Sequence, residues 1–122
     1  MPDLLLIDDN AELRKVLREA VEINGYQVTI ARDAEEGLAL LNDGYQPGMI
    51  ICDLALPHMS GLDFAGKIRQ NPRWSEIQII AMSGNITMKQ PALDAGADYY
   101  LVKPFSFQEL FDILEQGLSS ES

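Results

Sequence analysis

The sequence predicts an α/β fold, a doubly wound five-stranded parallel sheet with helices on both faces. Three observations predict it. Five short apolar segments alternate with segments whose apolar residues recur at the three-to-four-residue spacing of an amphipathic helix. The short segments are apolar almost throughout, which is typical of strands buried on both faces. Repeated strand and helix units imply parallel strands joined by right-handed crossovers.

The predicted strands are short, and most of them end beside polar residues. They are expected at residues 3–8, 27–31, 48–53, 77–83 and 99–102. In the doubly wound order 2-1-3-4-5, the first and third strands are neighbours. The ligand site of such a sheet lies beyond the carboxyl ends of its strands, where the strand order reverses. The residues that follow the strands are therefore the first candidates for a functional site.

Capping and stop signals bound the first two helices. Apolar residues from Leu13 to Val21 recur at helical spacing, and the Asn-Gly pair at 24–25 ends that segment. Asp33 is followed three residues later by Glu36, which resembles a capping box and predicts the start of the second helix.

The remaining helices are bounded less uniformly. Residues 62–68 carry an apolar face that predicts a third helix ending near Pro72. The segment 86–95 is ambiguous, because Pro91 would break a helix interior unless it lies near the first turn. A Ser-Phe-Gln-Glu segment at 106–109 caps the last helix.

The length of 122 residues fits one domain with one core. We expect that domain to occupy residues 1–118, and residues 119–122 to form a frayed tail or the stub of a linker. The apolar runs fall well short of the roughly 20 residues that a membrane span needs. No positively charged segment precedes the first apolar run, which disfavours a secretory signal. The sequence therefore predicts a cytoplasmic protein without membrane insertion.

The composition is strongly acidic, with 19 acidic against 9 basic residues and a net charge of −10. Direct nucleic-acid binding is disfavoured, because affinity for phosphate backbones depends on clustered Lys and Arg. We expect proteins and small cations as partners. Cys52 is the only cysteine, which excludes an internal disulfide and a cysteine-built metal site.

Polar side chains gather at the predicted carboxyl edge of the sheet. They are Asp8 and Asp9 after the first strand, Asp53 after the third, Ser83 after the fourth and Lys103 after the fifth. Two carboxylates about 4 Å apart repel by about 4 kcal/mol at an effective dielectric of roughly 20, so three of them together require a cation. Oxygen ligands without His or Cys favour a hard ion, and a small carboxylate set favours Mg²⁺ over Ca²⁺.

These residue types suit phosphoryl transfer. A carboxylate beside Mg²⁺ can attack phosphorus and form an acyl phosphate without a general base, because it is already ionised. The transferring group spreads charge over three oxygens, which calls for the metal, an ammonium and a hydroxyl or N–H donor. Asp53, Lys103 and Ser83 have the matching chemistry.

The chain resembles the receiver domains of bacterial two-component response regulators, including chemotaxis regulators, over nearly its whole length. Four segments carry the resemblance: "LLLIDDN" (4–10), "MIICDLALPHMSGLDF" (49–64), "IIAMSGN" (79–85) and "AGADYYLVKPF" (95–105). The resemblance implies the flavodoxin-like version of the fold. It also implies a phosphoacceptor switch that promotes its own phosphoryl transfer and dephosphorylation, and not a turnover enzyme.

The resemblance also assigns residues. It implies that Asp53 accepts the phosphoryl group and that Asp8, Asp9, Asp53 and the backbone carbonyl of Ala55 bind Mg²⁺. It further implies that Ser83 and Lys103 contact the phosphate, that Tyr100 is an aromatic switch residue, and that the Lys103–Pro104 peptide bond is cis.

The resemblance implies partners as well. The donor would be a phosphohistidine on a sensor histidine kinase or a histidine phosphotransfer protein. The output would be a downstream protein bound by the face that the fourth helix, fifth strand and last helix form. A homodimer through the last helix and fifth strand is an open alternative.

Other interpretations stay open from the residues. Asp8 and Asp9 would also suit a helix cap. A haloacid-dehalogenase-like phosphatase shares the Asp nucleophile and Mg²⁺, but it has a second Asp where this chain has Ala55. A flavin-binding module on the same fold would have a Ser/Thr-rich loop in place of the acids. A degenerate receiver used only for docking would not need all five site residues. His58 lies in a loop and is expected to be exposed and incidental.

Two departures from the family pattern also matter. Ala55 offers no polar side chain to orient an attacking water, and Asn85 is the only nearby candidate for that task. Pro91 falls in the expected fourth helix, so that helix is expected to be short or displaced.

Overall fold

The structure is a computed structural model that describes residues 3–119. Its elements are β1 (Asp3–Ile7), α1 (Ala11–Ile23), β2 (Gln27–Ala31), α2 (Ala34–Asn42), β3 (Met49–Asp53), α3 (Gly61–Gln70), β4 (Gln78–Ser83), the 3-10 turn η1 (Ile86–Met88), α4 (Lys89–Ala95), β5 (Tyr99–Val102) and α5 (Phe107–Ser119). The tail expected at 119–122 lies outside the described residues, apart from Ser119, where α5 ends.

The sheet has the predicted topology. Its order is β2-β1-β3-β4-β5, and all four strand pairs are parallel. β1 therefore lies between β2 and β3, and Ile7, the last residue of β1, is paired with Cys52, which directly precedes the last residue of β3. The residues that follow β1 and β3 leave the sheet side by side.

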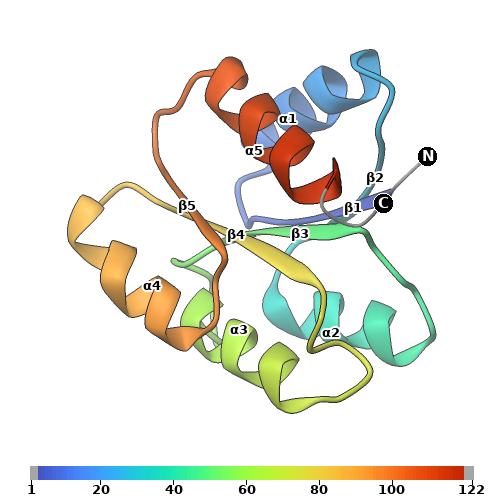
Figure 1. The fold of residues 1–122 in the computed structure, drawn as a ribbon, viewed down its shortest axis with the longest axis vertical. Coiled ribbons are helices and arrows are strands. Elements are labelled where there is room, and N and C mark those ends of the chain that lie inside the picture. Colours follow the sequence, from blue (N-terminus) through green and yellow to red (C-terminus); the bar gives the residue numbers. More distant parts are fainter. Residues whose placement is uncertain (1–2, 120–122) are drawn as a thin grey trace.

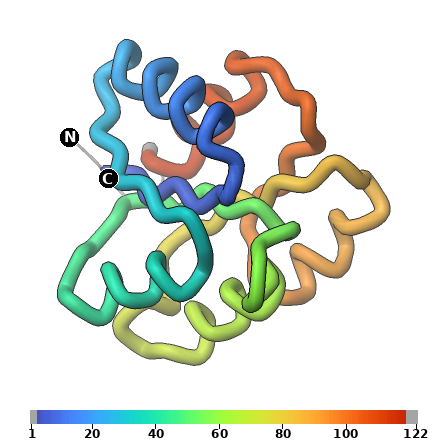
Figure 2. The backbone as a smooth tube through the Cα atoms, turned by 180° about the vertical axis from the view of Figure 1, so that it is seen from behind, coloured from blue at the N-terminus to red at the C-terminus, as the bar shows by residue number. Residues whose placement is uncertain are grey.

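The helices form a layer on each side of the sheet. Figure 1 shows α1 and α5 on one face and α2, α3 and α4 on the other. Figure 2 shows the same division from behind, with the blue α1 and the red α5 on the same side of the sheet. Buried side chains form one core under each layer: Leu17 and Leu114 lie under α1 and α5, and Phe64 and Ile68 lie under α2, α3 and α4. The predicted double winding is confirmed.

Side-chain caps begin the first two helices: Asn10, and not Asp8 or Asp9, is the N-cap of α1, and the predicted Asp33 is the N-cap of α2. The Asn10 side chain accepts hydrogen bonds from the backbone N–H groups of Glu12 and Leu13 at the start of α1. At the start of α2 the Glu36 N–H donates to Asp33 at 2.8 Å. Both caps satisfy N–H groups that a helix terminus leaves free.

The ambiguous segment resolves into a short helix. α4 has seven residues, Pro91 is the third of them, and a 3-10 turn precedes it. Pro91 lacks an N–H at a position where no intrahelical acceptor is available, so it is tolerated there. The expectation of a short fourth helix is confirmed.

Three local expectations also hold. The Lys103–Pro104 bond is cis, Cys52 is buried at 1% exposure, and His58 is exposed with a φ of 66°. Within residues 3–119, no helix has the length and apolar character that a bilayer crossing requires.

Candidate functional site

Three carboxylates meet at the carboxyl edge of the sheet. Asp8 and Asp9 follow β1 directly, and Asp53 is the last residue of β3. Each carboxylate offers an oxygen within 4.8 Å of an oxygen of the others. Because β1 and β3 are parallel neighbours, this convergence follows from the strand order that the sequence predicts.

Two of the three carboxylates are buried. Asp8 is 0% exposed and Asp53 is 6% exposed, whereas Asp9 is exposed. The Lys103 ammonium is 2.9 Å from Asp8 Oδ2 and 3.3 Å from Asp53 Oδ2. One cation therefore serves two buried anions, and Asp9 adds a third negative charge.

The electrostatic environment shifts the pKa values of both partners. Burial raises the pKa of Asp53, Lys103 lowers it in part, and the charge on Asp8 raises it further. Burial lowers the pKa of Lys103, but the hydrogen bond to Asp8 and the charges of both carboxylates outweigh this effect, so its pKa is raised. The site thus keeps Lys103 charged, and one more cation would further reduce the repulsion among its carboxylates.

The raised pKa of Asp53 predicts a stability effect of Asp53→Asn. A raised pKa means that stability from the protonated form is present below the usual value of 3.8 and is lost as pH rises through the folded-state pKa. At pH 7 without Mg²⁺ the ionised carboxylate therefore costs stability. We expect Asp53→Asn to raise the free energy of unfolding by about 1 kcal/mol at pH 7, which moves the midpoint of urea unfolding to a higher concentration. The gain should shrink towards pH 4, and a gain of equal size at both pH values would contradict the electrostatic origin.

Backbone contacts hold the acidic residues in place. Asp8 Oδ1 accepts a 2.8 Å hydrogen bond from the Asn10 N–H, and its carbonyl accepts a 2.8 Å bond from Arg14 Nη1. Asp53 Oδ1 accepts the N–H of Ala55 at 3.3 Å. Arg14 was not predicted from the sequence, because nothing in its spacing indicates a bond to a carbonyl six residues earlier.

Gly61, the first residue of α3, is a second residue whose role the sequence did not indicate. A Cβ there would lie 2.5 Å from the Asp53 carbonyl oxygen and 2.7 Å from Leu54 Cα, both backbone atoms. The Gly61 N–H also donates to the Leu54 carbonyl at 3.1 Å. The start of α3 can therefore pack against the backbone of Asp53 and Leu54 only without a side chain at this position.

This close approach predicts that Gly61→Ala destabilises the protein by about 2 kcal/mol, since backbone atoms cannot move aside cheaply. Gly66→Ala is the matched control in the same helix, because a Cβ at Gly66 meets nothing within 4 Å. The control should be neutral or more stable by up to about 1 kcal/mol. Urea unfolding followed by circular dichroism checks both, and equal effects of the two substitutions would refute the packing argument.

Ser83 is the last residue of β4, and Lys103 directly follows the neighbouring strand β5. Asp53 is paired with Met82 in the sheet, so Ser83 stands one position beyond the acidic residue on the neighbouring strand. The Ser83 hydroxyl oxygen accepts the Asn85 N–H at 3.1 Å. The Lys103 N–H donates to the Ser83 carbonyl at 2.8 Å, which connects the ends of β4 and β5.

Tyr100 and Asn85 link β5 to the loop after β4. The partly buried Tyr100 donates its hydroxyl hydrogen to the Asn85 carbonyl. The Asn85 side-chain oxygen accepts the Thr87 N–H at 2.9 Å and the Thr87 hydroxyl at 2.7 Å. The Asn85 side chain, a candidate from the sequence for orienting water, therefore caps η1 in this structure. Ala55 is exposed and brings no polar side chain.

The donor set fits a hard divalent cation. Asp8, Asp9 and Asp53 supply carboxylate oxygens from a cluster that contains no His or Cys among the described residues. Two of these anions are buried and share one ammonium, so a dication would offset repulsion that Lys103 leaves. Such a donor set suits Mg²⁺, which binds through one or two carboxylates, waters and phosphate oxygens.

The comparison with known families decides the affiliation of the chain. The model of the response regulator receiver domain family matches residues 4–115. The chain belongs to this family. This receiver domain is 33% identical over 107 residues to the response regulator MprA of Mycobacterium sp. (strain KMS), covering 88% of the chain and 46% of that protein. It is 34% identical over 110 residues to the transcriptional regulatory protein CpxR of Klebsiella pneumoniae, covering 90% of the chain and 46% of CpxR.

Solved structures agree with this assignment. The chemotaxis response regulator CheY4 of Vibrio cholerae superposes with a TM-score of 0.88 at 28% identity, covering 97% of this chain and 99% of that one. The receiver domain of the sensor histidine kinase PA1611 of Pseudomonas aeruginosa superposes with a TM-score of 0.88 at 28% identity, covering 97% of this chain and 98% of that one. That structure is described with a magnesium ion coordinated in its active site cleft. This receiver domain spans about half the length of the curated relatives it matches.

Proposed function

We propose that this receiver domain accepts one phosphoryl group on Asp53 from a phosphohistidine of a sensor histidine kinase or histidine phosphotransfer protein, with Mg²⁺ as cofactor. The observation that carries the proposal is the acidic cluster, in which Asp8, Asp9 and Asp53 have oxygens within 4.8 Å of one another. Lys103 reaches two of these carboxylates. That combination is what an anionic phosphoryl group and a dication need together.

Asp8, Asp9, Asp53 and the backbone carbonyl of Ala55 would hold the Mg²⁺. The bound ion supplies positive charge for the phosphoryl oxygens during transfer. The donor chemistry of the three carboxylates supports the choice of metal. The magnesium described for the PA1611 receiver domain, at 28% identity, supports it independently.

The residues have separate tasks in the transfer. An Asp53 carboxylate oxygen attacks phosphorus, the bond between phosphorus and the donor imidazole nitrogen breaks, and an acyl phosphate forms. Lys103 keeps its positive charge, because its pKa is raised, and it neutralises charge on the phosphoryl oxygens. In the structure the Ser83 hydroxyl oxygen accepts a hydrogen bond from the Asn85 N–H. When that bond breaks, the hydroxyl can turn and donate to a phosphoryl oxygen.

The same contacts support a switching role. Movement of Ser83 towards the phosphoryl group would disturb the loop that contains Asn85. That loop also accepts the Tyr100 hydroxyl, which makes Tyr100 the switch residue of the proposal. The same loop leads through η1 directly into α4, so a shift of the loop would reach the start of that helix. Phosphorylation need only shift two existing conformations by a few kcal/mol to change the face that α4, β5 and α5 present.

That face is the proposed binding surface for a downstream protein or a second copy of the chain. Direct nucleic-acid contact is not part of the proposal, given the net charge of −10. Nor is turnover, because Ala55 stands where a phosphatase of the haloacid-dehalogenase type has its general acid.

Intact-mass measurement after treatment with acetyl phosphate and Mg²⁺ tests the proposal. We expect the mass of one phosphoryl group per chain, dependent on Mg²⁺ and lost when EDTA is present during labelling. The absence of any mass increase at saturating Mg²⁺ would overturn the proposal. Sustained hydrolysis of a generic phosphate ester, in place of single labelling, would favour the phosphatase.

A further inference from the structure

A pocket lies at the opposite end of the sheet from Asp53. It has a volume of about 250 Å³ and is formed by α2, the loop before β3 and the loop before β4. Leu41, Pro47, Trp74 and Ile77 are its apolar residues, and Gln46 and Arg73 are polar residues that also line it. Asp53 ends β3, whereas the pocket borders the start of that strand, so the two sites do not overlap.

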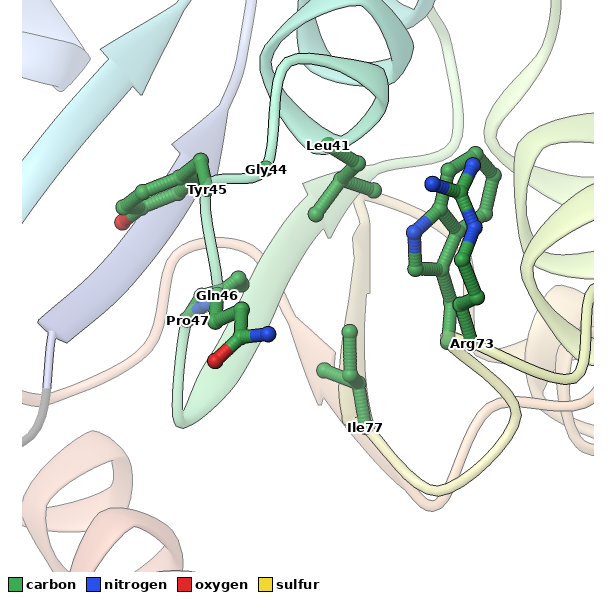
Figure 3. Close-up of a pocket in the computed structure, with 8 residues that line it drawn as sticks. Leu41, Gly44, Tyr45, Gln46, Pro47, Arg73 and Ile77 are labelled. Carbon is green, nitrogen blue, oxygen red and sulfur yellow. The ribbon is translucent and has the colours of Figure 1, made fainter.

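The pocket walls combine an apolar interior with converging polar groups. Figure 3 shows Leu41, Ile77 and Arg73 around one space, with the Gln46 amide directed into it and the Tyr45 ring turned away. Trp74 is only 8% exposed and belongs to the core on this face of the sheet. An indole and aliphatic side chains that surround a small space favour a flat or branched apolar group.

Arg73 is exposed and has two partners beside this pocket. Its guanidinium carbon lies 5.2 Å from the centroid of the Trp74 ring, and its Nη2 donates to Asn42 Oδ1 at 3.3 Å. A guanidinium is planar, and its N–H groups lie in that plane as a fork that pairs with a carboxylate. Stacking on the Trp74 ring favours one orientation of this plane.

The charge of the lining favours an anion. Among the described residues, Arg73 is the only charged side chain that lines the pocket. Asp43 and Glu76 are close in sequence, but both are exposed and neither lines it. The Gln46 amide adds a neutral donor, so the polar groups of the pocket match a carboxylate better than an amine.

The volume limits the ligand to a small molecule. Sites for drug-sized ligands usually exceed about 300 Å³, so this pocket suits a compound of roughly ten non-hydrogen atoms. A partner helix or a peptide strand would need a longer groove. We propose that this pocket binds a small organic carboxylate with an aromatic or branched apolar body, whose body enters the apolar interior and whose carboxylate pairs with Arg73.

Titration of the ¹⁵N-labelled protein with phenylacetate, followed by NMR, tests this proposal. We expect saturable shifts of the Gly44 backbone amide and the Gln46 side-chain amide, with a midpoint in the millimolar range, as expected for a ligand of this size. Acetate, which lacks the apolar body, and benzylamine, which carries the opposite charge, should not reach saturation over the same range. Unsaturable shifts scattered over the surface, or equal binding of benzylamine, would overturn the proposal.

Variants at Arg73 separate charge recognition from packing. Arg73→Gln should weaken phenylacetate binding about fivefold or more, and Arg73→Lys should lie between Gln and the native residue. Arg18→Gln is the matched control, because Arg18 is a surface residue of α1 paired with Glu22. Fluorescence of Trp74, the only tryptophan, gives a second readout of the same midpoint. Unchanged affinity in both Arg73 variants would refute the role of the guanidinium, whatever the outcome at Asp53.

Discussion

Asp53→Asn is expected to reduce phosphorylation of this domain by acetyl phosphate to below detection. An amide is a poor nucleophile towards phosphorus, and no other carboxylate in the described site combines burial, contact with Lys103 and a place at the end of β3. Asp8 is fully buried and bonded to the Asn10 N–H, whereas Asp9 is exposed. Intact-mass measurement in Mg²⁺ gives the labelled fraction directly.

Asp43→Asn is the matched control for this experiment. Asp43 follows α2, is exposed, and stands at the other end of the sheet from the acidic cluster. The control should label like the native chain, and both proteins should unfold cooperatively in urea. Labelling of Asp53→Asn at the native level would move the acceptor to another residue and end the proposed role of Asp53.

The convergence of the acidic residues was predictable, because topology alone determines it. A strand that ends at Asp53 lies next to a strand that ends just before Asp8 in any sheet with the order 2-1-3-4-5. The alternation of apolar and helical segments indicated a parallel sheet, and the doubly wound arrangement supplied the strand order. The position of Lys103 at the same edge of the sheet was predictable for the same reason, because it follows β5. Its contact with both Asp8 and Asp53 was not predictable, because it depends on the side-chain conformation.

Other features of the site were not predictable from the sequence, because they depend on tertiary packing. The requirement for glycine at Gly61 arises where the start of α3 meets the backbone of Asp53 and Leu54. The bond from Arg14 to the Asp8 carbonyl depends on how α1 lies against the loop after β1. Neither contact leaves a periodic or spacing signal in the chain.

The fourth helix shows where local rules leave two outcomes open. Proline is compatible with a first turn and incompatible with a helix interior, so Pro91 alone could not decide between a short helix and a loop. The structure has a short helix that follows a 3-10 turn capped by Asn85. The pocket beside Trp74 is a comparable case, because its lining comes from three segments that are separate in the sequence.

Lys103→Met is expected to destabilise the domain by about 2 kcal/mol at pH 7 without Mg²⁺. Removing one partner of a buried ion pair usually costs about 3–5 kcal/mol, and the partial exposure of Lys103 reduces that figure. Methionine keeps much of the apolar stem, so the loss comes mainly from the charge. Asp8 and Asp53 would then face each other without the ammonium that now contacts both.

Dependence on pH and Mg²⁺ identifies this charge effect. The raised pKa of Lys103 means that its stabilising contribution is present below the usual value of 10.5 and is lost as pH rises through the folded-state pKa. In Lys103→Met the carboxylates take up protons as pH falls, so the loss should shrink towards pH 4. Mg²⁺ should also restore stability at pH 7, because the ion binds the folded state.

Urea unfolding of Lys103→Met at pH 4 and 7, with and without Mg²⁺, checks these expectations. Lys15→Met, on the exposed surface of α1, is the matched control and should change stability by less than about 0.5 kcal/mol. A loss for Lys103→Met that is equal at both pH values and insensitive to Mg²⁺ would assign the effect to packing. In that case two buried carboxylates would be tolerated without a cation, and the physical argument for a metal at this edge of the sheet would fail.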